Sequence, residues 1–241
     1  MLLHPFPQDA SFWDAMRGRL RIPVDVIAPQ VPGFGGRELD DDLSITHLAG
    51  EVAEIIMRAD AETVVVCGLS MGGYVALALM AEHPHLVDGL ILANTRAESD
   101  SGEARAGRDA GIATIRTRGL GAFLDELMPK LTAPGADPDV VFTARATAEA
   151  QPAEAVTGAL EALRDRADRA DVLPAITVPT AVVQGGLDQV IPVEAIDRLV
   201  TGIPGAERHV IAGVGHLSAL EDPEAFARIV ESLVARAIAA Q

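Results

Sequence analysis

The sequence predicts an α/β fold with a mostly parallel sheet and helices on both faces. Short runs of β-branched and aliphatic residues alternate with longer segments whose apolar residues recur at helical spacing. This alternation is typical of parallel strands joined by helices, because each crossover helix packs on a face of the sheet. The chain has 241 residues, of which 49% are hydrophobic and 22% are charged. Such a chain can bury a large globular core.

The predicted strands are short aliphatic runs, at residues 2–4, 24–28, 63–67, 89–93, 180–184 and 207–211. Helical spacing predicts helices between them, at residues 11–20, 46–58, 71–82, 193–201 and 223–239. The last of these helices begins with Asp222-Pro223, an N-cap residue followed by a proline in the first turn. Strands and helices therefore alternate over most of the chain.

Residues 96–173 interrupt this alternation, because they contain helical patterns but no convincing strand. The helical segments lie at residues 103–117, 121–131, 138–149 and 152–168, with proline and glycine clusters between them. A helical excursion that completes the core is one interpretation. We favour a helical cap, inserted after the strand at 89–93 and lying over the strand ends where open sheets bind ligands. Residues 1–95 and 174–241 would then form the core.

One predicted strand ends in a Gly-x-Ser-x-Gly motif, Gly68-Leu69-Ser70-Met71-Gly72, and a helical pattern follows at once. Strand, motif and helix together describe a sharp turn that presents a serine hydroxyl at the end of the sheet. Glycine suits positions 68 and 72, because this turn strains the serine backbone and brings neighbouring chain very close. The alternative is a glycine-rich turn whose serine caps the helix. The flanking strand and helix favour Ser70 as a nucleophile.

A serine nucleophile needs a base to take its proton and an acid to orient that base. Asp188 follows the strand at 180–184 after a glycine break, and His216 follows the strand at 207–211 after another. The chain order Ser70, Asp188, His216 is the order expected for a nucleophile on this kind of sheet. Asn94 ends the strand at 89–93 but is not an acid. The sequence therefore predicts a triad of Ser70, Asp188 and His216.

Acyl transfer also needs two backbone N–H donors for the oxyanion. We expect one from Met71, the residue after the nucleophile. We expect the other from Phe6 in the loop after the first strand, because the neighbouring Pro5 and Pro7 have no N–H.

These motifs together resemble the α/β-hydrolase fold superfamily over nearly the whole chain. The segment 68–72 resembles the nucleophile elbow, Asp188 the triad acid and Gly215-His216 the triad base. Residues 4–7 resemble the family's His-Gly-x-Pro oxyanion loop, and residues 28–35 its Pro-Asp-x-x-Gly-x-Gly loop. The chain is most similar to small esterases, enol-lactonases and cofactor-free haloperoxidase-like perhydrolases, which share a helical cap.

The chain departs from the family pattern at three places. Pro5 replaces the usual loop glycine, and Gln30 replaces the usual aspartate. The chain also begins at what resembles the family's third strand, so that it lacks the usual N-terminal strand hairpin. A misassigned start is the alternative explanation. Residues 24–28 would then form an exposed sheet edge, which invites pairing with a second copy. We therefore expect a homo-oligomer or another covering of this edge.

The resemblance and the residues together predict a serine hydrolase that acts on a small ester or lactone through an acyl-enzyme, without metal or cofactor. The cap residues Phe123, Leu127 and Met128 are candidates for contacting a largely apolar substrate, although they could also pack the cap. A perhydrolase or acyltransferase, and a C–C bond hydrolase or lyase, would use the same triad. A non-catalytic ligand-binding receptor on the same fold is the remaining alternative.

The composition excludes several partners and sites. The formal net charge is −16, from 35 acidic and 19 basic residues, which disfavours nucleic acid and anionic membranes as partners. No run approaches the ~20 apolar residues that span a bilayer, and the N-terminus has no secretion signal pattern. The single cysteine, Cys67, excludes an internal disulfide and a cysteine-rich metal site. We therefore expect a cytoplasmic protein.

Overall fold

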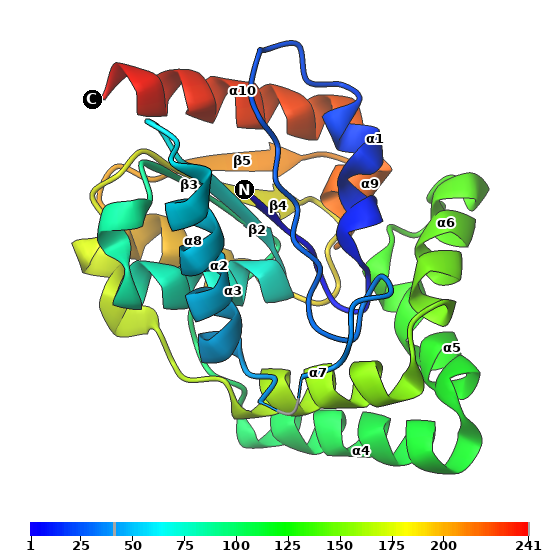
Figure 1. Ribbon diagram of the computed structural model, residues 1–241. Helices are drawn as coiled ribbons and strands as arrows, with labels where there is room; N and C mark the ends of the chain where they lie inside the picture. Colours follow the sequence, from blue (N-terminus) through cyan, green and yellow to red (C-terminus); the bar gives the residue numbers. More distant parts are fainter. Residues whose placement is uncertain (41, 241) are drawn as a thin grey trace.

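The structure, a computed structural model, describes residues 1–40 and 42–240. It is built on a five-stranded sheet in which the strands lie in chain order (Figure 1). The strands are β1 (Leu2–Leu3), β2 (Val65–Leu69), β3 (Gly89–Ala93), β4 (Thr180–Gly185) and β5 (Glu207–Ile211). Each neighbouring pair is parallel. The predicted parallel sheet is therefore confirmed.

Parallel pairing brings the carboxyl ends of the strands to one edge of the sheet. Ser70 follows β2 directly, and Asn94 follows β3 directly. The loops after β4 and β5 carry Asp188 and His216. Segments far apart in the sequence therefore converge at this edge, where open α/β sheets place their ligand sites.

Helices cover both faces of the sheet. α3 (Met71–Glu82) packs against β1, β2 and β3, and α2 (Ile45–Ala59) packs on α3. α10 (Pro223–Ala239) packs against β2 to β5 and lies across the sheet from α2 and α3 (Figure 1). α8 (Val193–Gly202) contacts β4. The predicted helices at these places are confirmed to within one residue at either end.

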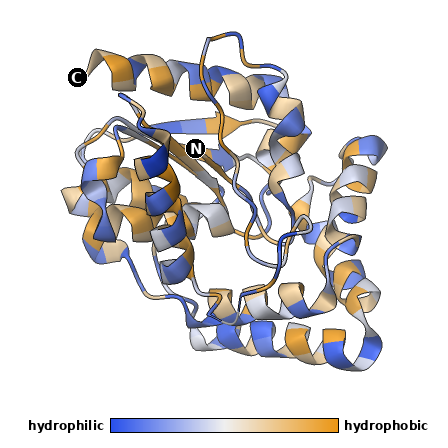
Figure 2. Cartoon of the chain, in the orientation of Figure 1, coloured by the Kyte–Doolittle hydropathy of each residue, from blue (hydrophilic) through white to orange (hydrophobic). Residues whose placement is uncertain are grey.

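The hydropathy of the strands follows their place in the sheet. β3 and β4 are buried along their whole length, as expected for strands covered on both faces. β5 is an edge strand with charged and exposed residues, and it is mostly hydrophilic in Figure 2. Charges on an edge strand discourage pairing with another sheet. Within the described residues, no helix combines the length and the apolar character that crossing a membrane requires.

Residues 96–173 are helical, as predicted. They contain α4 (Gly102–Arg118), α5 (Leu120–Leu131), α6 (Pro138–Glu149) and α7 (Ala153–Asp165), and they continue into a short 3₁₀ helix, η3 (Ala170–Ala175). α4 packs against both α5 and α7, and α6 packs against α5. In Figure 1 these four helices form one group on the side of the molecule away from α10.

A buried ion-pair cluster ties the two ends of this helical segment together. Asp100, near its start, accepts from Arg166 near its end at 2.6 Å, from Arg108 at 3.1 Å and from Arg96 at 3.2 Å. Burial alone would raise the pKa of Asp100, but the Arg108 and Arg166 charges and hydrogen bonds lower it below its ordinary value. The guanidinium of Arg166 also lies 4.1 Å from the centre of the Tyr74 ring on α3. The helical segment is therefore fixed to the core at its base.

Two predictions near the N-terminus are wrong. Residues 24–28 are not a strand, although the Leu2 N–H donates to Ile27 O at 2.8 Å beside β1. Pro23 and Pro29 flank this segment and have no N–H to extend the pairing. Residues 11–20 do not form one helix either. They contain a 3₁₀ turn, η1 (Ala10–Trp13), and a short helix, α1 (Asp14–Arg17).

Other elements differ from prediction only at their ends. β1 stops at Leu3, β2 begins two residues later than predicted, and α7 ends at Asp165. The remaining short helices are η2 (Pro84–Leu86) and α9 (Ser218–Glu221).

Candidate active site

Ser70 occupies the tight turn between β2 and α3. Its backbone has φ 54° and ψ −111°, a conformation that residues with a side chain rarely adopt. The Ser70 N–H donates to Ala93 O at 2.9 Å, and Ser70 O accepts from the Gly73 N–H and from the Thr95 hydroxyl, both at 2.9 Å. These bonds hold the strained turn against the end of β3. The Ser70 residue is buried at 9% exposure.

Both glycines of the motif make backbone contacts that leave no room for a side chain. A Cβ at Gly68 would lie 2.2 Å from the carbonyl oxygen of Gly72, and a Cβ at Gly72 would lie 2.1 Å from that of Leu3. The obstacle is backbone in both cases, so it cannot turn aside as a side chain could. The close approach of β1, β2 and α3 at this turn therefore depends on glycine.

His216 and Asp188 form a buried hydrogen-bonded pair. The His216 Nδ1 lies 3.1 Å from Oδ1 and 3.0 Å from Oδ2 of Asp188. Asp188 Oδ1 also accepts from the N–H groups of Val190 at 2.8 Å and Ile191 at 3.2 Å. Burial alone would raise the pKa of Asp188, but the His216 charge and hydrogen bonds from His216, Asn94 and Val190 lower it below its ordinary value. An ionised Asp188 thus accepts a hydrogen bond from the Nδ1–H of His216, which leaves Nε2 free for another partner.

Asn94 is a site residue that the sequence prediction set aside because it is not an acid. Its amide nitrogen donates to Asp188 Oδ2 at 2.8 Å and approaches Gly215 O at 3.4 Å. Its side-chain oxygen accepts from the Ser218 hydroxyl at 2.6 Å. The Asn94 backbone has φ 46°, which asparagine tolerates better than most residues. Its place at the end of β3, between the strands that carry Ser70 and Asp188, was the signal for this role.

Glu221 is a second residue that the sequence prediction missed. Its carboxylate accepts from the Gly215 N–H at 3.0 Å and from the Ala133 N–H at 2.8 Å. It therefore ties the loop before His216 to the loop after α5. A Cβ at Gly215 would lie 2.5 Å from the Ala133 nitrogen, so the two loops touch directly. The sequence carries no motif that marks this glutamate.

The predicted triad residues therefore form two groups, Ser70 in one and the Asp188–His216 pair in the other. The structure joins His216 to Asp188 directly, whereas no hydrogen bond joins the Ser70 hydroxyl to His216 within the described residues. Asn94 and Thr95 connect the two groups, since the Asn94 amide contacts Asp188 and the Thr95 hydroxyl contacts Ser70 O. Catalytic hydrogen bonds are often long in unliganded sites and tighten when substrate binds.

The two predicted oxyanion donors belong to different segments. Met71 begins α3, where the first N–H groups of a helix have no intrahelical acceptor. Phe6 lies in the loop after β1, which a hydrogen bond from the Gln8 N–H to Pro5 O closes at 2.9 Å. Gln30, which replaces the family's aspartate, accepts from the Ala10 N–H at 2.9 Å. This contact holds the Phe6 loop against the segment around residue 30.

His4, at the start of the same loop, is fully buried. Its Nε2 accepts from the Val31 N–H at 3.2 Å, and its Nδ1 lies 3.1 Å from Pro5 O. Because Nε2 is an acceptor, Nδ1 carries the proton and the ring is neutral. Burial lowers the pKa of His4 from 6.5 to about 4.

We expect this histidine to make the fold sensitive to moderate acid. Between about pH 6.5 and pH 4 the unfolded chain binds a proton at His4 that the folded chain does not, so stability falls as the pH falls. The loss reaches about 3 kcal/mol for a shift of this size. Urea unfolding of the wild type and of His4→Gln across this range measures it. Equal pH dependence in the two proteins would contradict the expectation.

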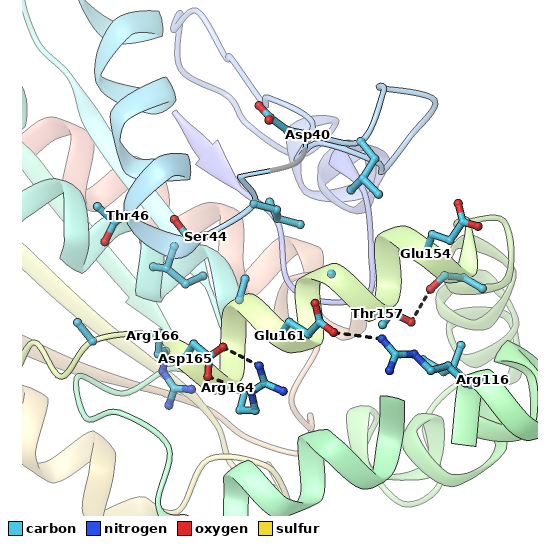
Figure 3. Close-up of a pocket in the computed structure, with 18 residues that line it drawn as sticks. Asp40, Ser44, Thr46, Arg116, Glu154, Thr157, Glu161, Arg164, Asp165 and Arg166 are labelled. Atoms are coloured by element: carbon cyan, nitrogen blue, oxygen red, sulfur yellow. Dashed lines mark hydrogen bonds and ion pairs between the residues drawn. The ribbon is translucent and has the colours of Figure 1, made fainter. Parts of the chain in front are cut away.

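A cavity of about 780 Å³ lies away from these residues. It opens between the start of α2 and the helices α4 and α7, and none of Ser70, Asp188 and His216 lines it (Figure 3). Its three arginines are paired, Arg116 with Glu161 at 3.4 Å, Arg164 with Asp165 at 2.7 Å and Arg166 with Asp100 at 2.6 Å. The positive charges of these arginines are therefore neutralised by carboxylates of the protein itself.

A second cavity, of about 320 Å³, borders the loop that contains Phe6. It lies between α4 and α5, and Phe6 of the predicted oxyanion loop lines it together with Phe123 and Leu127. The rings of Phe6 and Phe123 meet edge to face, with centroids 6.3 Å apart. Met128, the third predicted substrate contact, is buried in the core and does not line this cavity.

One group of potential metal ligands lies apart from the candidate site. Ligand atoms of Asp40, His47 and Glu51 lie within 4.8 Å of one another. The guanidinium of Arg37 already contacts Glu51, so a cation would have to compete with that arginine. The absence of a metal requirement stays a prediction.

The chain matches known proteins over most of its length. A profile described as "Alpha/beta hydrolase family" matches residues 1–229. A pimeloyl-[acyl-carrier protein] methyl ester esterase of Neisseria meningitidis serogroup A is 30% identical, over 97% of this chain and 75% of that protein.

Two solved structures share most of the architecture. An esterase of Thermogutta terrifontis, solved with malate bound, has a TM-score of 0.92 and 32% identity, covering 98% of this chain and 89% of that one. An enol-lactonase of Burkholderia xenovorans has a TM-score of 0.86 and 26% identity, covering 97% of this chain and 90% of that one.

Proposed function

Because the chain belongs to the alpha/beta hydrolase family, we propose that it is a serine hydrolase that cleaves a small, largely apolar carboxylic ester or lactone. Ester hydrolysis is supported by its esterase and enol-lactonase relatives. The observation that carries the serine-dependent mechanism is the strained Ser70 turn at the edge of the sheet that also holds the buried Asp188–His216 pair.

In this mechanism the Ser70 hydroxyl attacks the ester carbonyl while Nε2 of His216 takes its proton. As the bond to the alkoxide breaks, His216 gives that proton to it, so an alcohol leaves and the acyl group stays on Ser70 as an acyl-enzyme. Water then attacks the acyl-enzyme with His216 again as base, which releases the carboxylic acid and restores Ser70. Asp188 keeps the imidazole in the required tautomer and stabilises its charge, and Asn94 holds Asp188 in place.

The N–H groups of Phe6 and Met71 are the proposed donors to the oxyanion. Loss of one such donor typically costs about 2.7–4 kcal/mol of transition-state stabilisation. The helices α4 to α7 act as the cap, with Phe123 and Leu127 facing the substrate beside Phe6. The ion-pair cluster around Asp100 fixes this cap to the core at its base. A cap held in this way would exclude water from the reaction.

A fluorophosphonate probe and a panel of p-nitrophenyl esters and lactones test the proposal together. We expect the probe to label Ser70, and ester turnover to be lost in proportion to labelling. Replacing water by peroxide or an alcohol as acyl acceptor tests for perhydrolase or transferase activity. A folded protein that neither reacts with the probe nor hydrolyses any ester would contradict the proposal and favour a ligand-binding receptor.

A further inference from the structure

The α4 wall of the cavity between α4 and α5 consists mainly of small residues, with Arg108 and Thr114 beside them, and it faces larger side chains on α5. The residues concerned are Ala104, Gly107, Ala110 and Gly111 on α4, and Phe123, Leu127 and Lys130 on α5. Gly107 is exposed, and a Cβ there would have no neighbour within 4 Å, so this part of the wall is open to solvent.

This cavity borders the loop that carries a proposed oxyanion donor. Phe6, whose N–H is that donor, lines it, although none of Ser70, Asp188 and His216 does. Lys130 also lines the cavity, and it precedes Leu131, whose carbonyl accepts from the Leu217 N–H at 3.0 Å. Leu217 directly follows His216 in the chain. The helix that carries Lys130 therefore contacts the segment of the catalytic base at its end.

Lys130 contributes a charge that the protein itself does not neutralise. It is the only lysine of the chain. The other charged residues of the cavity are paired, Glu126 with Arg118 at 2.9 Å and Arg108 with Asp100 at 3.1 Å. No ion pair involves Lys130 among residues 1–40 and 42–240. The Lys130 residue is exposed, so its ammonium is accessible to a charged ligand.

We propose that the α4–α5 cavity binds one arm of the substrate and that Lys130 binds a carboxylate at the end of that arm. The substrate class is then an ester whose acyl chain carries a second, free carboxylate, such as the monoester of a dicarboxylic acid. The apolar walls contact the methylene chain, and the ammonium pairs with the distal charge. This inference rests on the proposed serine hydrolase activity.

Matched ester pairs test the charge recognition. Each pair consists of a mono-p-nitrophenyl ester of a dicarboxylic acid and the same molecule with its free carboxylate methylated, at several chain lengths. We expect Lys130→Met to lower the ratio of kcat/KM for the charged over the neutral ester by roughly threefold, because Lys130 is exposed to solvent. Lys130→Arg should restore most of that ratio, and added salt should reduce it in the wild type. Arg228→Met on α10 is the control for net charge.

A second substitution tests occupancy of the cavity itself. Gly107→Leu places a side chain in the free space, so we expect kcat/KM to fall for long acyl chains and to change little for acetate esters. An unchanged charge ratio in Lys130→Met, with neutral esters still hydrolysed, would overturn this inference alone. Absence of hydrolysis for every ester would instead overturn the proposed function.

Discussion

Ser70→Ala is expected to lower kcat/KM for a hydrolysed ester by roughly 10⁴- to 10⁶-fold, because triad residues act as a unit. The fold should be unaffected. The backbone atoms of Ser70 make the hydrogen bonds that hold the turn, and alanine keeps all of them. The free energy of unfolding should therefore change by less than about 1 kcal/mol. Ester kinetics, together with urea unfolding of the same preparation, measure both effects.

Ser232→Ala provides the matched control for this substitution. Ser232 lies on the exposed side of α10, so loss of its hydroxyl should change neither turnover nor stability. Turnover of purified Ser70→Ala within tenfold of the wild type would be incompatible with a serine nucleophile at this position.

Gly72→Ala is expected to cause the largest loss of stability among the substitutions considered. The new Cβ would lie 2.1 Å from Leu3 O and 2.6 Å from the Leu3 carbonyl carbon. Relief requires that β1 and α3 separate, which disturbs the sheet edge and the Phe6 loop together. We expect the free energy of unfolding to fall by about 3 kcal/mol or more. Thermal and urea unfolding measure this loss, and residual ester turnover should fall with it.

Gly50→Ala in α2 is the control for this substitution. A Cβ at Gly50 would have no neighbour within 4 Å, and the residue lies in a helix interior. The same chemical change should therefore stabilise the protein by about 0.5–1 kcal/mol. If the two variants were equally stable, the tight contact between Gly72 and β1 would not exist in solution.

Local patterns in the sequence were enough to predict the elements that have strong patterns of their own. The β-branched run before Ser70 and the apolar helix after it defined β2 and α3, and alternation with other strands defined a parallel sheet. The segment at 24–28 misled the prediction because its alternating apolar residues resemble a strand. Whether such a segment pairs depends on the N–H groups available beside β1, and Pro23 and Pro29 remove two of them.

The candidate site was predictable where a motif or a strand end marks a residue. Ser70, Asp188 and His216 each follow a strand, so the sequence alone was enough to predict that they lie at the same edge of the sheet. Asn94 and Glu221 could not be assigned in this way. Their roles come from contacts with Asp188, Gly215 and Ala133 that no local pattern specifies.

The sequence by itself determined the order of strands and helices, the turn at Ser70 and the residue types available for acyl transfer. These features depend on hydrophobic spacing and on glycine, which act over a few neighbouring residues. Only the tertiary structure decided which side chains meet. Segments tens of residues apart meet in the Asp188–His216 pair and in the ion-pair cluster around Asp100. The cavity at Gly107 likewise lies between two separate helices. Such contacts depend on how whole helices and strands pack together, and packing is a property of the complete chain.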